Sequence, residues 1–122
     1  MENANDIIYS LTLDGVFTYV SPNWTEILGH DPSEIIGKSF ALFVHPEDIP
    51  ACQAFLESVI STGKSRRGVR YRVRHVDGRW RWHTSNGSVL KKENGKVEEY
   101  IGIARDITEQ VKAEDRKSTR LN

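Results

Sequence analysis

The sequence has little cysteine and no long apolar run. Cys52 is the one cysteine among 122 residues, so an intramolecular disulfide is impossible and a reducing compartment suits the chain. No stretch approaches the roughly 20 apolar residues that span a bilayer. The polar segment from Met1 to Asp6 lacks the basic and apolar regions of a signal peptide. We therefore expect a cytoplasmic domain that makes no membrane contact.

The chain also lacks an excess of charge of either sign. Seventeen Lys and Arg balance seventeen Asp and Glu, which removes the electrostatic footprint of a dedicated nucleic-acid-binding protein. Four dispersed histidines and one cysteine fall short of a structural zinc pattern. His45, Glu47 and Asp48 cluster as helix-start residues do, and no nucleophile with its base is visible. We expect a binding domain and not an enzyme.

The length allows one domain with one modest core. Its N-terminal part predicts a β-hairpin, because Asp14-Gly15 separates two strand-like segments, Asp6–Leu13 and Val16–Val20. Apolar residues occur at both alternating sets of positions in the first segment. The alternation is imperfect, with Ile8, Ser10 and Thr12 at one set of positions and Ile7, Tyr9, Leu11 and Leu13 at the other.

Three helix starts follow the hairpin. Ser21-Pro22, Asp31-Pro32 and His45-Pro46 each place proline where a first helical residue stands, and Ser21 and Asp31 are good N-caps. The first two helices must be short because glycines interrupt them. The third has an amphipathic pattern up to Thr62, and Pro50 leaves its start open between residues 46 and 50.

The C-terminal half predicts three antiparallel strands. Val69–Val76 alternates, Asp77-Gly78 makes a turn, Arg79–Leu90 returns, and Asn94-Gly95 turns the chain into Val97–Thr108. Two strands, a set of helices and three more strands predict an α+β domain with its helices on one sheet face.

Three further segments need an interpretation. Asn86-Gly87 lies inside a strand-like run and predicts a bulge. Glu109–Lys117 is helix-compatible but marginal without a partner. The charged stretch 114–122, with Leu121 as its one large apolar residue, is interpreted as a linker or cloning remnant. We assign 1–108 to the domain and 109–122 to a linker that begins a signalling helix.

Several motifs resemble those of PAS domains, which include a C-terminal PAC motif. Tyr71–Trp82 and Tyr100–Glu109 resemble the C-terminal half of that family, and Asp14-Gly15, Ser21–Asn23 and Val44–Asp48 resemble its N-terminal half in the right order. The resemblance covers Asp6 to Thr108. It implies a five-stranded antiparallel sheet in the order 2-1-5-4-3, with helices enclosing a pocket on one face. It also implies a sensor that relays a signal to a C-terminal effector in cis, such as a two-component histidine kinase or a cyclic-dinucleotide enzyme.

The strand pairing of that family would direct one set of side chains into the pocket. A concave, mostly apolar site with a few polar groups is the usual small-molecule site, whereas a fully packed core is the norm for such positions. Both interpretations stay open: a ligand-binding sensor, or a ligand-free interaction module with a filled core. His83 either contacts the ligand or is hydrogen-bonded within the core. The ligand-binding candidates are Tyr71, Val73, His83, Ser85, Tyr100 and Ala104, with His75 and Gly102 at the same alternation.

Known PAS cofactors do not match the residues present. Haem-binding members carry an axial histidine on the long helix, and 51–62 contains none. The flavin-binding photoreceptor branch needs an Asn-Cys-Arg motif, which is absent, and Ala104 stands where its glutamine would be. Cys52 is interpreted as an inert core residue. We expect neither haem nor a covalent flavin photocycle, and the ligand stays unknown.

The opposite sheet face combines arginines with large apolar side chains. Exposed aromatics rimmed by charge are typical of interfaces, so this face predicts a homodimer or a docked helix. The alternative is that neighbouring arginine stems cover the tryptophans. A single-strand nucleic-acid platform is disfavoured by the neutral chain. The interface candidates are Trp80, Trp82, Ile101 and Ile103, beside Arg70, Arg72 and Arg74.

Asp106-Ile107-Thr108 ends the last predicted strand and opens the C-terminal helix. Asp106 or Thr108 can cap free amide groups there. The resemblance implies that this tripeptide links the sensory core to the output helix. A plain helix cap is the alternative, and the two roles are compatible.

Overall fold

The structure of the chain is a computed structural model that describes residues 5–120, with side chains described up to residue 117. Predictions that concern residues 1–4 and Leu121 lie outside the described residues. In chain order the elements are β1 (Asp6–Leu11), β2 (Phe17–Val20), α1 (Asn23–Leu28), the short 3-10 helices η1 (Pro32–Glu34), η2 (Phe40–Leu42) and η3 (Pro46–Asp48), α2 (Ile49–Thr62), β3 (Arg66–Arg74), β4 (Trp80–Lys91), β5 (Val97–Asp106) and α3 (Thr108–Arg120).

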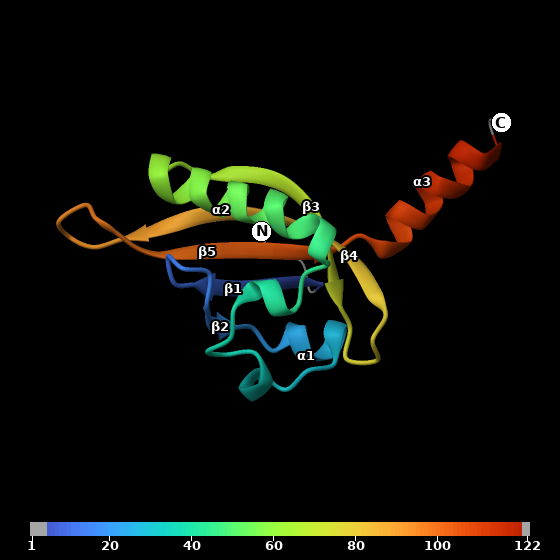
Figure 1. Ribbon diagram of the computed structural model, residues 1–122, viewed down its shortest axis with the longest axis horizontal. Helices are drawn as coiled ribbons and strands as arrows, with labels where there is room; N and C mark the ends of the chain where they lie inside the picture. The colour runs from blue at the N-terminus through green and yellow to red at the C-terminus, as the bar shows by residue number, and fades with distance from the viewer. Residues whose placement is uncertain (1–4, 121–122) are drawn as a thin grey trace.

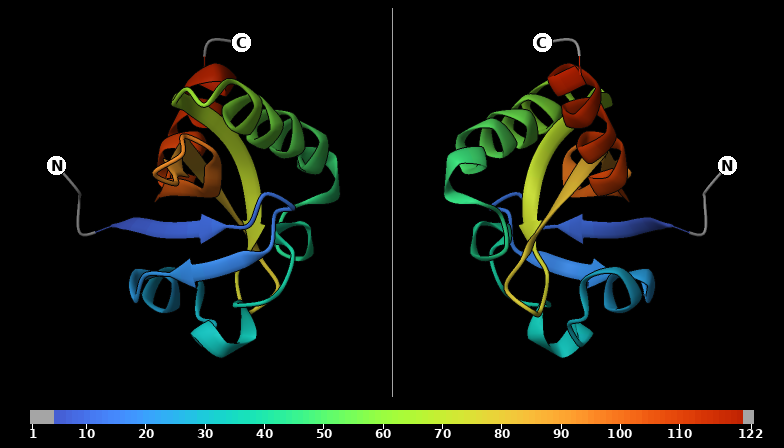
Figure 2. Two further views of the ribbon diagram at one scale, coloured as in Figure 1. Left: turned by 90° about the vertical axis from the view of Figure 1, so that its left-hand side faces the viewer. Right: turned by 90° about the vertical axis from the view of Figure 1, so that its right-hand side faces the viewer.

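The strands form one five-stranded antiparallel sheet in the order β2-β1-β5-β4-β3. This confirms the predicted α+β fold and strand order. In Figure 1, α2 runs along the β3–β5 part of the sheet, while α1, η1 and η2 gather at the β1–β2 part. The third 3-10 helix, η3, leads directly into α2 and is hydrogen-bonded to β3 through Asp48 and Arg72. Figure 2 shows the sheet strongly twisted, as right-handed strand twist requires. The core lies between this sheet and the helices.

The buried face of β1 is the one that carries Ile7, Tyr9 and Leu11, each 9% exposed or less. On the other face, Ile8 and Ser10 are half-buried. The choice follows from tertiary structure, because β1 pairs with both β2 and β5 and its inner face meets the helices. The buried residues belong to the more apolar set of the imperfect alternation in the sequence.

The helix starts differ in detail from the prediction. Asp31 caps η1 by accepting from the Ser33 amide at 2.9 Å, as expected. Ser21 does not cap α1, because its hydroxyl accepts from the Ile8 amide at 2.9 Å and the helix begins at Asn23. The long helix begins at Ile49, so Pro50 lies in its first turn, where a missing amide costs nothing.

The predicted bulge at Asn86-Gly87 is wrong. β4 pairs regularly with β5 there, with Gly87 opposite Gly102. The irregularity lies in β3, where the register shifts between Arg67 and Val69 and Gly68 has a φ of 93°. The Gly68 amide donates to the Asn86 carboxamide oxygen at 3.2 Å. The extra residue therefore belongs to the edge strand, which tolerates it more easily.

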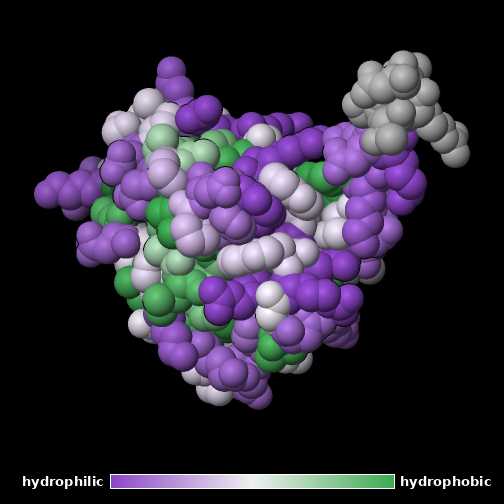
Figure 3. All heavy atoms as spheres, turned by 45° about the vertical axis from the view of Figure 1, so that its right-hand side comes forward, coloured by the Kyte–Doolittle hydropathy of each residue, from purple (hydrophilic) through white to green (hydrophobic). Residues whose placement is uncertain are grey.

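The last helix, α3, projects away from the body of the domain (Figure 1). It extends to Arg120, three residues beyond the predicted end at Lys117. In Figure 3 the surface next to the grey C-terminal residues is almost entirely hydrophilic. Within residues 5–120, no helix combines the length and the apolar character that a membrane span needs.

Candidate ligand cavity and the contacts of its wall

A cavity of about 50 Å³ lies between α2 and the inner face of the sheet. Of the predicted ligand-binding residues, Tyr71, Val73, His83, Tyr100 and Ala104 line it. All of these are 8% exposed or less. The sequence pattern therefore locates the sheet side of the cavity, because strand alternation fixes which side chains share a face.

Three of the residues at the predicted alternation, Ser85, His75 and Gly102, do not line the cavity. Ser85 is only 1% exposed and lies behind the tyrosine hydroxyls, to which it is hydrogen-bonded. His75 lies beyond the end of β3, in the turn to β4, where its ring nitrogen Nδ1 is 3.2 Å from Asp77. The strand alternation wrongly predicted that His75 faces the cavity, because β3 ends one residue earlier, at Arg74.

The sequence analysis did not predict the residues that form the other walls of the cavity. They come from β1, the hairpin, the helical segment and α2, and they are largely aromatic and aliphatic. Phe40 and Phe43 were missed because the helix η2 was not predicted. Ile7, Tyr9 and Leu11 were missed because no face of β1 had been assigned to the cavity. A signal did exist on α2, whose amphipathic face points at the sheet. The missed lining residues are Ile7, Tyr9, Leu11, Phe17, Trp24, Phe40, Phe43, Val44, Cys52, Phe55, Leu56 and Val69.

Two tyrosine rings lie flat on the sheet over a pair of glycines. A Cβ at Gly102 would run into the Tyr9 ring, and a Cβ at Gly87 would run into the Tyr100 ring. Gly87 and Gly102 face each other across β4 and β5. The glycines permit this close approach, as glycine inside a strand often does. The close approach of the Tyr100 ring is therefore the physical reason for Gly87, which the sequence analysis had interpreted as part of a bulge.

The tyrosine hydroxyls meet at Ser85. Tyr9 donates to the Ser85 hydroxyl at 3.1 Å, and Tyr71 shares a 2.6 Å hydrogen bond with the same oxygen. Burial raises the pKa of Tyr9 and Tyr71 above the usual phenol range, and burial likewise raises the pKa of Tyr100. All of these hydroxyls therefore stay protonated, and this wall is polar but uncharged.

Cys52 reaches the cavity from α2 and is half-buried. Burial, together with the nearby Asp48 charge, raises the pKa of its thiol to about 12. Because the thiolate is the nucleophile in cysteine chemistry, Cys52 is unreactive near neutral pH. Across the described residues, no group of three or more His, Cys, Asp and Glu side chains is placed to hold a metal ion.

His83 lies between the cavity and a cluster of polar groups at the start of α3. Its side chain is 2% exposed, and its Nε2 atom is 3.4 Å from Asp106 Oδ2. That separation exceeds an ordinary N–H···O hydrogen bond. Nε2 is the one buried side-chain nitrogen or oxygen of the described residues that has no hydrogen-bond partner. The interpretation of His83 as a fully hydrogen-bonded core histidine therefore does not fit this atom.

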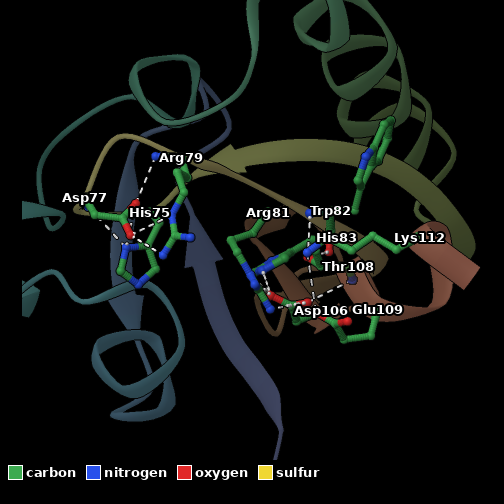
Figure 4. A network of polar contacts seen from close by, with 10 residues as sticks. All are labelled: His75, Asp77, Arg79, Arg81, Trp82, His83, Asp106, Thr108, Glu109 and Lys112. Carbon is green, nitrogen blue, oxygen red and sulfur yellow. Dashed lines mark hydrogen bonds and ion pairs between the residues drawn. The ribbon is translucent and has the colours of Figure 1, made fainter.

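Asp106 is the centre of that polar cluster, which Figure 4 shows beside the separate His75–Asp77–Arg79 group. It accepts from Arg81 Nε at 2.9 Å, from Arg81 Nη2 at 3.1 Å and from the Thr108 amide at 2.9 Å. Burial raises the pKa of Asp106, but contacts with His83, Arg81 and Thr108 outweigh burial and hold that pKa well below its usual range. Asp106 is therefore a carboxylate at neutral pH.

The tripeptide Asp106-Ile107-Thr108 attaches α3 to β4. The Trp82 amide donates to the Thr108 hydroxyl at 2.9 Å, and the Ile107 amide donates to the Trp82 carbonyl at 2.8 Å. Ile107 itself is 6% exposed. Capping by Asp106 is thus a direct observation, and these bonds bring the root of α3 next to His83.

The tryptophan side chains on the outer face of the sheet are less exposed than the sequence suggests. The guanidinium carbon of Arg72 lies 5.1 Å from the Trp82 ring centroid, and that of Arg74 lies 5.3 Å from the Trp80 ring centroid. Both indoles are half-buried. Ile103, in contrast, is 37% exposed, and Ile101 beside it is half-buried.

Comparisons with known proteins agree with this geometry. The PAS fold family matches residues 17–104. The chain is 33% identical over 96 residues to the blue light receptor lreA of Aspergillus flavus, and 32% identical over 97 residues to the white collar 1 protein of Neurospora crassa. Each match covers 79% of this chain but only 11% and 8% of the respective relative.

Solved structures share the fold. The PAS-B domain of Cycle from Drosophila melanogaster, solved with bound ethylene glycol, superimposes with a TM-score of 0.76 at 24% identity, covering 82% of this chain and 98% of that one. A PAS domain from Colwellia psychrerythraea gives a TM-score of 0.77 at 24% identity, covering 87% of this chain and 89% of that one. The chain belongs to the PAS fold family.

Proposed function

We propose that this PAS domain is a sensory module whose cavity binds a small uncharged molecule and whose α3 helix passes the change to an effector that follows in the same protein. The observation that carries the proposal is the apolar cavity of about 50 Å³ in the middle of an otherwise packed core. A core with no binding role is expected to be filled to crystal-like density. The similarity to a blue light receptor and a white collar protein supports a sensory role.

The volume of the cavity limits the ligand. Drug-sized molecules and cofactors occupy sites of roughly 300–1,000 Å³, so a cavity of about 50 Å³ does not fit a haem or a flavin in this conformation. A ligand of a few heavy atoms fits better. The neutral tyrosine hydroxyls around Ser85 favour one that is apolar or carries a hydroxyl group. The raised pKa of Cys52 argues against a covalent flavin adduct.

The alternative is a ligand-free PAS domain that acts by association. The small size of the cavity supports it, and so does the exposed Ile103 on the central strand of the outer face. A homodimer through that face is compatible with either function. In both cases the domain acts by binding and not by catalysis. A histidine kinase or a cyclic-dinucleotide enzyme as effector, and a cytoplasmic location, are proposals from the family and the single cysteine.

Native mass spectrometry of the purified chain tests the proposal, with denaturing mass spectrometry as its control. A discrete adduct that is lost on denaturation supports the sensor and gives the ligand mass. Amide shifts of Val73 and Ala104 under xenon pressure support it independently, because xenon enters apolar cavities. A dimer with no adduct and no xenon-dependent shifts contradicts ligand binding and favours the association module.

A further inference from the structure

His83 contacts both the cavity and the polar cluster at the root of α3. Its ring lines the cavity and its Nε2 faces Asp106. Asp106 in turn holds the Thr108 amide, the first of α3. No other cavity-lining residue among those described lies within an ion-pair distance of Asp106.

The unpartnered Nε2 leaves room for a second, closer arrangement of this contact. A buried donor or acceptor without a partner is unfavourable, and moving Nε2 about 0.5 Å toward Oδ2 would bring it into ordinary hydrogen-bond range. A carboxylate accepts up to about four hydrogen bonds, whereas Asp106 has the two from Arg81 and the one from Thr108. Asp106 therefore has room for one more donor.

We propose that His83 is the positioning residue through which a molecule in the cavity acts on α3. An occupant presses the imidazole toward Asp106, and the Nε2–H···Oδ2 hydrogen bond that forms fixes the Asp106 carboxylate in the orientation that accepts from the Thr108 amide. A ligand shifts a conformational equilibrium only by the difference in its free energy of interaction with the two states. Here the difference comes from the contact of the occupant with the displaced imidazole, and the satisfied Nε2 lowers the free energy of the displaced state. The proposal rests on the sensory function above, but its test needs no ligand.

The test fills the cavity from the opposite wall. Cys52→Leu adds apolar volume to the cavity from α2, far in sequence from α3. The readout is hydrogen exchange of the Thr108 and Val111 amides, measured by NMR with His83 intact and in a His83→Phe background, which keeps a ring but has no Nε2. We expect Cys52→Leu to slow this exchange about fivefold when His83 is present, the scale of one added hydrogen bond. In the His83→Phe background, Cys52→Leu should leave the exchange unchanged.

A conservative variant separates positioning from mere packing. His83→Gln retains a side-chain donor toward Asp106 and should restore at least part of the slowing, which a purely structural role would not predict. Equal slowing with His83 intact and in the His83→Phe background would show that the cavity reaches α3 without the imidazole and would overturn the proposal. No slowing in either background would overturn it as well. Failure of xenon to enter the wild-type cavity contradicts the sensory function alone.

Discussion

At the scale of single residues, the cavity depends on what is missing from two positions in the sheet. Gly87 and Gly102 allow the rings of Tyr100 and Tyr9 to lie against the backbone. A larger residue at either position would lift a ring into the space above the sheet. Lifting the Tyr9 ring from Gly102 would also take its hydroxyl away from Ser85. The small residues therefore determine the shape of the cavity as much as the large ones do.

Gly102→Ala should destabilise the domain by about 1–3 kcal/mol, as overpacking of a rigid core does. The new methyl group would run into the Tyr9 ring. Urea denaturation measures the change. In a Tyr9→Leu background the same substitution should have a clearly smaller effect, because the clash is removed. Equal effects in the two backgrounds would contradict this account of the glycine.

Asp48 provides a residue-scale prediction about pH. It accepts from Arg72 Nε at 2.9 Å, from Arg72 Nη2 at 3.0 Å and from the Arg72 amide at 2.8 Å. These hydrogen bonds with Arg72 lower the pKa of Asp48 in spite of partial burial. A folded-state pKa below the unfolded value of about 3.9 contributes stability that is present above that value and is lost as the pH falls below it.

Asp48→Asn should therefore reduce the free energy of unfolding by about 1–2 kcal/mol at pH 7, through lost charge-assisted hydrogen bonds. The difference from the wild type should shrink as the pH falls below about 4, because Asp48 is then protonated in the unfolded chain while the folded state still holds the carboxylate, and it should disappear below the lowered folded-state pKa. Denaturant titrations from acidic to neutral pH measure both quantities. Asp14→Asn, in the exposed first hairpin turn, is the matched control. A difference that stays constant with pH would refute the ion pair as its cause.

At the scale of elements, the sequence was a good guide where local chemistry decides and a poor one where packing decides. Turn dipeptides such as Asp77-Gly78 and the alternation in β3 predicted the strands and most of the sheet wall of the cavity. The helix η2 was not predicted, because its position depends on contacts with the first hairpin, such as the 2.9 Å hydrogen bond that the Phe40 amide donates to the Gly15 carbonyl. The role of Gly87 was equally hidden, since it depends on Tyr100, far along the chain, folding back over it.

The attachment of α3 should depend on the Thr108 side chain. Thr108→Val leaves the partly buried Trp82 amide without its 2.9 Å acceptor, which should cost about 1 kcal/mol, the lower end for an unsatisfied buried group. We expect faster hydrogen exchange of the Val111 amide, which bonds to the Ile107 carbonyl in the first turn of α3. Ser61→Ala, at the exposed end of α2, is the control and should leave it unchanged. An unaltered Val111 amide in Thr108→Val would contradict the attachment.

At the scale of the whole molecule, the two sheet faces have different tasks. The inner face builds the cavity and the outer face is left to solvent or to a second copy. On that outer face the arginine stems already cover much of Trp80 and Trp82. The apolar surface that a partner could cover therefore centres on Ile103 of the central strand β5, which is flanked by β1 and β4.

Sedimentation analysis tests the proposed homodimer. Ile103→Lys should weaken association by about two orders of magnitude or more, because like charges would meet at the centre of a symmetric interface. Replacing Trp80 and Trp82 together with Ser should weaken it less, since those rings are partly covered within one chain. Leu42→Lys, at a 61% exposed position on the helical side, is the control. Identical masses for the wild type and Ile103→Lys would exclude this face as the interface.

The wall of the cavity also contains an optical reporter. Trp24 is 5% exposed, lines the cavity and donates its indole N–H to His30 at 3.1 Å. Its ring packs edge-on against Phe17, at a centroid distance of 5.2 Å. An indole held this rigidly beside a binding space emits light that depends on what fills that space. The intrinsic fluorescence of the unlabelled domain should therefore carry a component that follows cavity occupancy, while Trp80 and Trp82 report separately on the outer face.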